Sequence, residues 1–89
     1  MDNVEFERAI VASLAAIIEK RGLKHKPVAM AAWPYKKAAW RQWQNMRNND
    51  IPLRLTFRDA FNMAQHLDVP LSSLCAMAES QILDEELKQ

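Results

Sequence analysis

Apolar residues recur at intervals of three and four in three separate stretches of this chain. Such spacing places the side chains on one side of an α-helix, whereas a β-strand would require alternation. The stripes consist of Phe6, Ile10, Leu14, Ile17 and Ile18 within 4–21, then Phe57, Ala60, Phe61, Ala64 and Leu67, and finally Leu71, Leu74, Cys75, Ala78 and Ile82. No stretch shows convincing strand alternation, so the sequence predicts an all-α fold whose amphipathic helices share one core.

The length of 89 residues suits a single domain, because a chain of this size can build only one modest hydrophobic core. Hydrophobic residues make up 49% of the chain and glycine occurs once, which indicates an ordered helical protein. We expect one domain over 1–89, with a core of about 4–83 and a charged tail over 84–89. Cys75 is the only cysteine, which excludes an internal disulfide and fits a cytoplasmic protein. No apolar run reaches the roughly 18 residues that span a bilayer, so we expect no membrane segment.

Glycine and proline divide the first half of the chain into short helices. Gly22 is expected to end the first helix, because glycine adopts the left-handed conformation that closes a helix end. Pro27 is tolerated in the first turn of a second, short helix over 26–33, which Pro34 must end. A third helix is expected to start near Tyr35, in "YKKAAWRQWQNM".

The segment "NMRNNDIPLRL", 45–55, contains three asparagines and Pro52 and is expected to form an irregular connection. Thr56, followed three residues later by Asp59, resembles the capping box that starts a helix. Pro70 is expected to end this fourth helix, and a fifth helix follows it. The sequence therefore predicts five helices, of which the second and third are short and closely joined.

The net charge of +1 conceals a strong separation of charge along the chain. Residues 1–19 carry −3, residues 20–58 carry ten bases against one acid and so +9, and residues 59–89 carry −5. Like charges repel one another in a folded domain, so a basic concentration of this size favours a polyanionic or acidic partner. The alternative is that these bases form a solvated surface without a partner.

Three pieces of sequence, in this order, resemble a known family. The piece "EKRGLKH", 19–25, is similar to the exit from the first helix of the lambda repressor and Cro type of helix-turn-helix domain. The piece "WRQWQN", 40–45, resembles the end of that family's recognition helix. The piece "MAQHLDVPLSSL", 63–74, resembles the family's L-A-x-x-L-G-V-S-x-x-x-L pattern. The resemblance covers about residues 8–78. It implies a five-helix lambda-repressor-like domain with the helix-turn-helix at helices 2 and 3, which binds duplex DNA through helix 3.

The resemblance also implies roles for individual residues. Contact with DNA bases is implied for Lys36, Lys37, Ala38, Arg41 and Gln42. Contact with the DNA backbone is implied for His25, Lys26, Asn45, Arg47 and Asn48. Lysine and glutamine can hydrogen-bond base edges in the major groove, whereas contacts to phosphate fix the orientation of the protein without reading the sequence.

Two tryptophans three residues apart can anchor a short helix to its neighbours while other side chains of that helix face outward. We therefore expect Trp40 and Trp43 to be core anchors, together with Leu14, Phe61 and Leu67. With the anchors turned inward, the polar and basic residues of the third helix would be free to contact a ligand.

These features predict a small bacterial or phage transcriptional regulator, for instance a prophage repressor, that binds a palindromic operator as a homodimer. The fifth helix is a candidate for the dimer interface through Leu71, Leu74, Ala78, Ile82, Leu83 and Leu87, or else a lid on the core. Pro34 and Met46 stand where the family usually has glycine, which leaves the angle between the second and third helices open. These departures also keep a second function open, that of a protein-interaction module of the antitoxin or anti-repressor type.

Other chemistry is not indicated. The sequence has no recognisable set of nucleophile and base, no phosphate-binding glycine loop and no carboxylate pair, so we expect no enzyme activity and no cofactor. His25 and His66 fall on different predicted helices without companion ligands, so we expect no metal site.

Overall fold

The computed structural model describes residues 2–48 and 54–88, and within them it contains five helices and no strand. The helices are α1 (Asn3–Lys20), α2 (His25–Ala32), α3 (Ala39–Asn48), α4 (Phe57–His66) and α5 (Leu71–Leu87). The predicted all-α class is confirmed. The part of the predicted connection that includes Asn49 and Pro52 lies outside the described residues.

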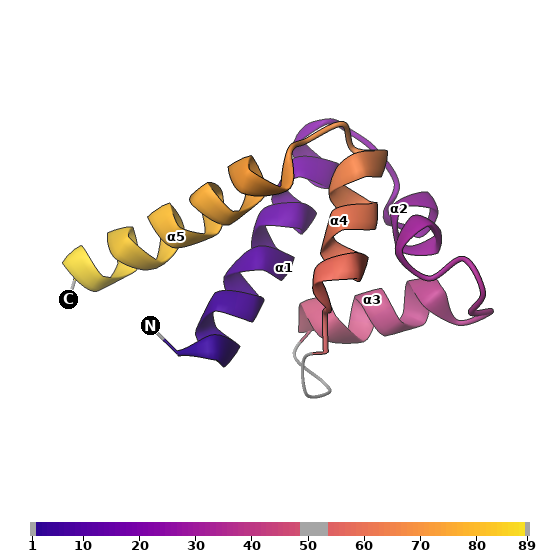
Figure 1. Ribbon diagram of the computed structural model, residues 1–89, viewed down its shortest axis with the longest axis horizontal. Coiled ribbons are helices and arrows are strands. Elements are labelled where there is room, and N and C mark those ends of the chain that lie inside the picture. Colours follow the sequence, from indigo (N-terminus) through magenta and orange to yellow (C-terminus); the bar gives the residue numbers. More distant parts are fainter. Residues whose placement is uncertain (1, 49–53, 89) are drawn as a thin grey trace.

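The helices form one elongated body that measures 40 × 27 × 22 Å (Figure 1). α5 packs mainly against α1, and α2 packs against both α3 and α4. Figure 1 shows the two ends of the chain close together on one side, with α2 and α3 on the opposite side. α2 and the start of α3, which carry part of the basic stretch, therefore lie away from the ends of the chain.

Both ends of α1 are closed by residues next to them in sequence. Asp2 and Glu5 form a capping box, in which the Glu5 backbone N–H donates to Asp2 Oδ1 at 2.7 Å. At the other end Gly22 has a φ of 68°, and the N–H groups of Gly22 and Leu23 donate to the carbonyls of Glu19 and Ile18, each at 3.0 Å. The prediction that Gly22 ends the first helix is confirmed.

The start of α4 was predicted correctly and its end was not. The Asp59 N–H donates to Thr56 Oγ1 at 3.1 Å, and the Thr56 N–H donates to Asp59 Oδ2 at 3.2 Å, as the predicted capping box requires. The helix ends at His66, before Pro70, because Asp68 takes a φ of 58° and turns the chain. Pro70 instead caps the start of α5.

The C-terminal segment also differs from the prediction. α5 continues through Leu87, so residues 84–87 of the expected tail belong to this helix. The side of α5 that packs on the rest of the molecule buries Leu74, Ala78 and Ile82. This side of α5 therefore covers the core, as the predicted lid would.

Three of the five predicted core anchors are buried: Leu14, Trp43 and Leu67. The prediction is wrong for Trp40, which is 43% exposed, because the buried stripe of α3 runs through Ala39, Trp43 and Met46. Trp40 lies about 100° around the helix from Ala39 and faces the edge of this stripe.

Phe61 is also wrongly predicted as a core anchor, since it is 49% exposed. The buried positions of α4 include Ala60, Met63 and Ala64, so Met63 supplies the bulk that the sequence pattern assigned to phenylalanine. Of the predicted stripe, Ala60, Ala64 and Leu67 are buried, whereas Phe57 and Phe61 lie on its exposed side.

Candidate nucleic-acid interface

The segment between α2 and α3 is longer than predicted. Trp33 caps the end of α2 and is buried, and the Lys36 N–H donates to the Trp33 carbonyl at 3.1 Å to form a turn. α3 starts at Ala39, and Ala38 provides the carbonyl that accepts the Gln42 N–H at 3.0 Å. Lys36, Lys37 and Ala38 therefore lie in the turn before α3, whereas the sequence placed them on the helix. Pro34 explains the end of α2, because it disfavours the helical conformation at Trp33, and the bond from the Lys36 N–H to the Trp33 carbonyl then holds the turn.

This turn and the outward side of α3 form a shallow hollow of about 770 Å³, which we call the basic groove. Its lining residues are Lys36, Lys37, Ala38, Arg41, Gln42, Asn45, Met46 and Arg54. All five residues predicted to contact bases line it, and so does Asn45 from the predicted backbone set. The described lining residues include four cations and no carboxylate, so the groove concentrates positive charge.

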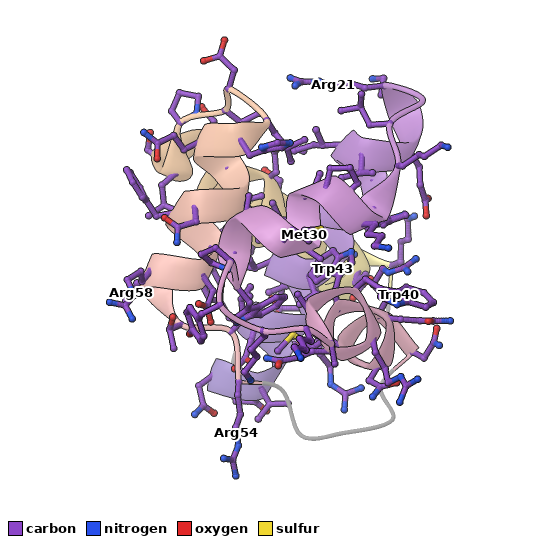
Figure 2. The ribbon with its side chains drawn as sticks, turned by 90° about the vertical axis from the view of Figure 1, so that its right-hand side faces the viewer. Arg21, Met30, Trp40, Trp43, Arg54 and Arg58 are labelled. Carbon is purple, nitrogen blue, oxygen red and sulfur yellow. The ribbon has the colours of Figure 1, made fainter. Side chains whose placement is uncertain are left out.

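Arg54 and the buried Met46 are the lining residues that were not predicted as site residues, and of the two only Arg54 is charged. It precedes α4 in the chain, and Figure 2 shows its side chain extending away from the body of the molecule. Its place within the basic stretch 20–58 was the only sequence signal. Nothing local in the sequence indicates that it meets the groove formed by α3.

One hydrogen bond orders side chains within the basic groove. Lys36 Nζ donates to Gln42 Oε1 at 2.7 Å, and thereby links the turn to the first half of α3. Lys36, Lys37 and Arg41 are exposed, whereas Gln42 is half-buried. The groove thus presents exposed cations around a glutamine whose side-chain amide is bonded to one of them.

His25, predicted to contact the DNA backbone, is engaged inside the protein. Trp43 Nε1 donates to His25 Nδ1 at 3.0 Å, so in the neutral ring the proton lies on Nε2, which is 3.3 Å from Glu19 Oε1. The ring therefore links α1, α2 and α3, and neither ring nitrogen is free for a phosphate.

Arg47 and Asn48, also predicted to contact the backbone, lie outside the basic groove. Arg47 Nη1 is 3.4 Å from His25 Nε2, its Nε atom is buried, and the side chain lines a different hollow between α1 and α5. Asn48 is exposed at the last position of α3. The residues predicted to contact the DNA backbone therefore do not lie together. Asn45 lines the basic groove, whereas Arg47 points toward α1.

Lys26, the remaining residue of that set, lines a second hollow of about 370 Å³ beside the basic groove. We call it the aromatic hollow, and its other lining residues are Met30, Pro34, Tyr35, Lys36, Lys37, Ala39 and Trp40. Tyr35 is 71% exposed, and Met30 and Trp40, labelled in Figure 2, are about half exposed. The two hollows share Lys36 and Lys37, so an apolar patch borders the basic groove.

Within the residues that the structure describes, no three histidine, cysteine or acidic side chains come together as a metal site would require. None of the described helices is long and apolar enough to cross a bilayer. Comparison with protein families, with characterised proteins and with solved structures found no significant match. The chemistry of the two hollows is therefore the basis for assigning a function.

Proposed function

We propose that this chain binds duplex DNA through the basic groove, as a transcriptional regulator of the lambda repressor and Cro type with α3 in the major groove. The observation that carries the proposal is the lining of the groove, where Lys36, Lys37, Arg41 and Arg54 surround Gln42 and Asn45 without a carboxylate among the described lining residues. Cations neutralise phosphates, and cations and amides hydrogen-bond base edges.

The geometry of α3 supports this proposal. Its ten residues extend over about 15 Å, and the major groove of B-DNA, roughly 12 Å wide, admits a helix of this kind. Trp43 and Met46 fix one side of α3 in the core, which leaves Arg41 and Asn45, one turn apart, on the side that lines the groove. A ligand held in the groove would therefore contact α3 and the turn before it together.

The proposed roles follow the positions of the side chains. Gln42 and Lys36 read a base, Lys37, Arg41 and Arg54 contact phosphates, and Asn45 offers a further amide to a base or phosphate. His25 links α3 to α1 and α2, Arg47 lies beside it, and in this proposal neither contacts DNA directly.

Binding to a palindromic site as a homodimer is part of this proposal, since pairing doubles the groove contacts. Leu74, Ala78 and Ile82 are buried within one chain and cannot form the interface without opening the core. A dimer formed through α5 would have to use its outward residues, of which Leu83 is 53% and Leu87 is 85% exposed.

The test is selection of bound fragments from random duplex DNA, followed by titration of the enriched site at several salt concentrations. Arg54→Ala should reduce the salt dependence of binding, the slope of log K against log salt, by about 0.9 per bound chain. Arg58→Ala is the matched control, because Arg58 lies on α4 outside the groove and points in a different direction in Figure 2. Failure to enrich any site, or equal losses from the two variants, would contradict the proposal.

The aromatic hollow favours a second candidate function, a protein-interaction module of the antitoxin or anti-repressor type. Exposed Tyr35, Met30 and Trp40 side by side offer the kind of apolar patch that partners cover. Binding to DNA that is weak, independent of sequence and lost near physiological salt would favour this function over the first. Under the first proposal, Trp40→Ala leaves the preference for the enriched site unchanged.

A further inference from the structure

The hydrogen bond between Lys36 and Gln42 restricts the base that Gln42 can read. Gln42 Oε1 accepts from Lys36 Nζ at 2.7 Å, and both residues are anchored through their backbones. The Lys36 N–H is bonded to the Trp33 carbonyl at 3.1 Å, and the Gln42 N–H to the Ala38 carbonyl at 3.0 Å. The two side chains therefore reach the groove from fixed positions and meet there.

The base that a glutamine prefers depends on which of its amide atoms are free. To read adenine, the amide must accept from N6 and donate to N7 at the same time. Guanine shows two acceptors, N7 and O6, in the major groove and so requires two donors. Gln42 Oε1 has two lone pairs, of which one accepts from Lys36 and the other lies beside the ammonium. The other groups that the pair offers, the amide N–H groups of Gln42 and the remaining N–H groups of the Lys36 ammonium, are all donors.

We propose that Lys36 and Gln42 act as one composite donor that selects guanine over adenine at one position of the DNA site. This inference rests on the proposed function, because it names what the basic groove reads. An adenine in the same place would bring its N6 amino group against the ammonium, donor to donor. Lys36 is thus a specificity-determining residue that acts both directly and by orienting Gln42.

The test compares the preference of Lys36→Met with that of the wild-type chain. The position to be scored is the one whose discrimination is lost in Gln42→Ala. There the wild-type chain should prefer guanine over adenine by roughly tenfold, as a good paired contact does. Lys36→Met keeps an unbranched side chain and frees Oε1, so the preference should fall to about threefold or less, or shift to adenine. Competition between duplexes that differ at this base pair measures the ratio.

Two further variants separate orientation from charge. Lys37→Met removes one positive charge from the same groove without touching the Lys36–Gln42 pair, so it should weaken binding in general and leave the guanine preference unchanged. Lys36→Arg keeps a donor for Oε1 and should retain the preference. Lys36, Lys37 and their backbone turn are exposed, and circular dichroism of each variant checks that the fold is intact.

The outcomes distinguish this inference from the proposed function. If the wild-type chain enriches no duplex site, both are overturned. If a site is enriched but Gln42→Ala alters no position, or Lys36→Met keeps the full preference for guanine, DNA binding stands and the composite donor is overturned.

Discussion

Replacing Trp43 with phenylalanine tests how the three N-terminal helices are held together. Trp43 is fully buried, and its indole N–H is bonded to His25 at the start of α2. Phenylalanine keeps an aromatic ring in the core but has no N–H and less surface. The substitution therefore removes one defined hydrogen bond and a known part of the packing between α2 and α3.

The expected loss of stability follows from three contributions. A phenyl ring buries roughly 40 Å² less than an indole, which is about 1 kcal/mol at about 25 cal/mol per Å². The space left behind adds about 1 kcal/mol because a packed core relaxes only in part. The lost hydrogen bond to His25 adds about 1 kcal/mol. The total of about 3 kcal/mol is a large fraction of the roughly 4–13 kcal/mol expected for a domain of 89 residues.

Urea unfolding followed by circular dichroism measures this loss, with Trp40→Phe as the matched control. The control makes the same chemical change at a position that is 43% exposed and whose indole N–H forms no hydrogen bond with the described residues, so it should cost under about 1 kcal/mol. Adding His25→Ala to both the wild-type chain and Trp43→Phe isolates the hydrogen bond, whose coupling free energy should be about 1 kcal/mol. Equal losses from the two tryptophan variants, or a coupling near zero, would refute this reasoning.

Two other substitutions test the helix ends. Gly22→Ala places a side chain where φ is 68°, and the new Cβ has no neighbouring atom within 4 Å. The expected loss of stability, about 1 kcal/mol, should therefore come from the backbone conformation alone. It should appear as a lower urea midpoint. Thr56→Ala removes the oxygen that accepts the Asp59 N–H and should cost about 1 kcal/mol. Thr56→Ser keeps that oxygen and should restore most of the stability, whereas a serine variant as unstable as the alanine variant would show that the cap is not the cause.

The helix ends could be predicted because their signals are local. Gly22 closes α1 and Thr56 opens α4 through atoms only three to five residues away in sequence. The end of α4 was missed because Asp68, which is not a glycine, takes the left-handed conformation. Pro70 is a stronger sequence signal for the end of a helix than Asp68 is. The end of the helix was therefore predicted after Asp68, the residue that turns the chain.

The misplacement of Trp40 has a physical explanation within α3. Periodicity fixes the angle between Trp40 and Trp43 but does not decide which of them lies at the centre of the buried side. A stripe centred on Trp43 continues through Ala39 and Met46, whereas one through Trp40 continues to the polar side of the helix and Arg47. Reading the stripe over its whole length would have identified Trp43 as the anchor.

The candidate site could be predicted only where its residues are neighbours in sequence. Lys36, Lys37, Ala38, Arg41 and Gln42, which the sequence grouped, line one hollow because the turn and the first half of α3 keep them together. Arg54, which precedes α4, also lines this hollow although it is distant from residues 36–42 in sequence, and the bond from Trp43 to His25 depends on how α2 packs against α3. Neither of these is encoded in the spacing of residues along one helix.

Arg21, at the end of α1, donates a hydrogen bond from its guanidinium to the carbonyl of Leu67, which caps α4. The C-terminal ends of α1 and α4 therefore lie side by side, and each carries about half a negative elementary charge from its aligned peptide groups. The positive charge of the Arg21 guanidinium lies near these two negative helix ends and offsets the repulsion between them. Arg21 therefore contributes less to the attraction of a polyanion than its formal charge suggests, because its guanidinium is directed at the protein's own backbone.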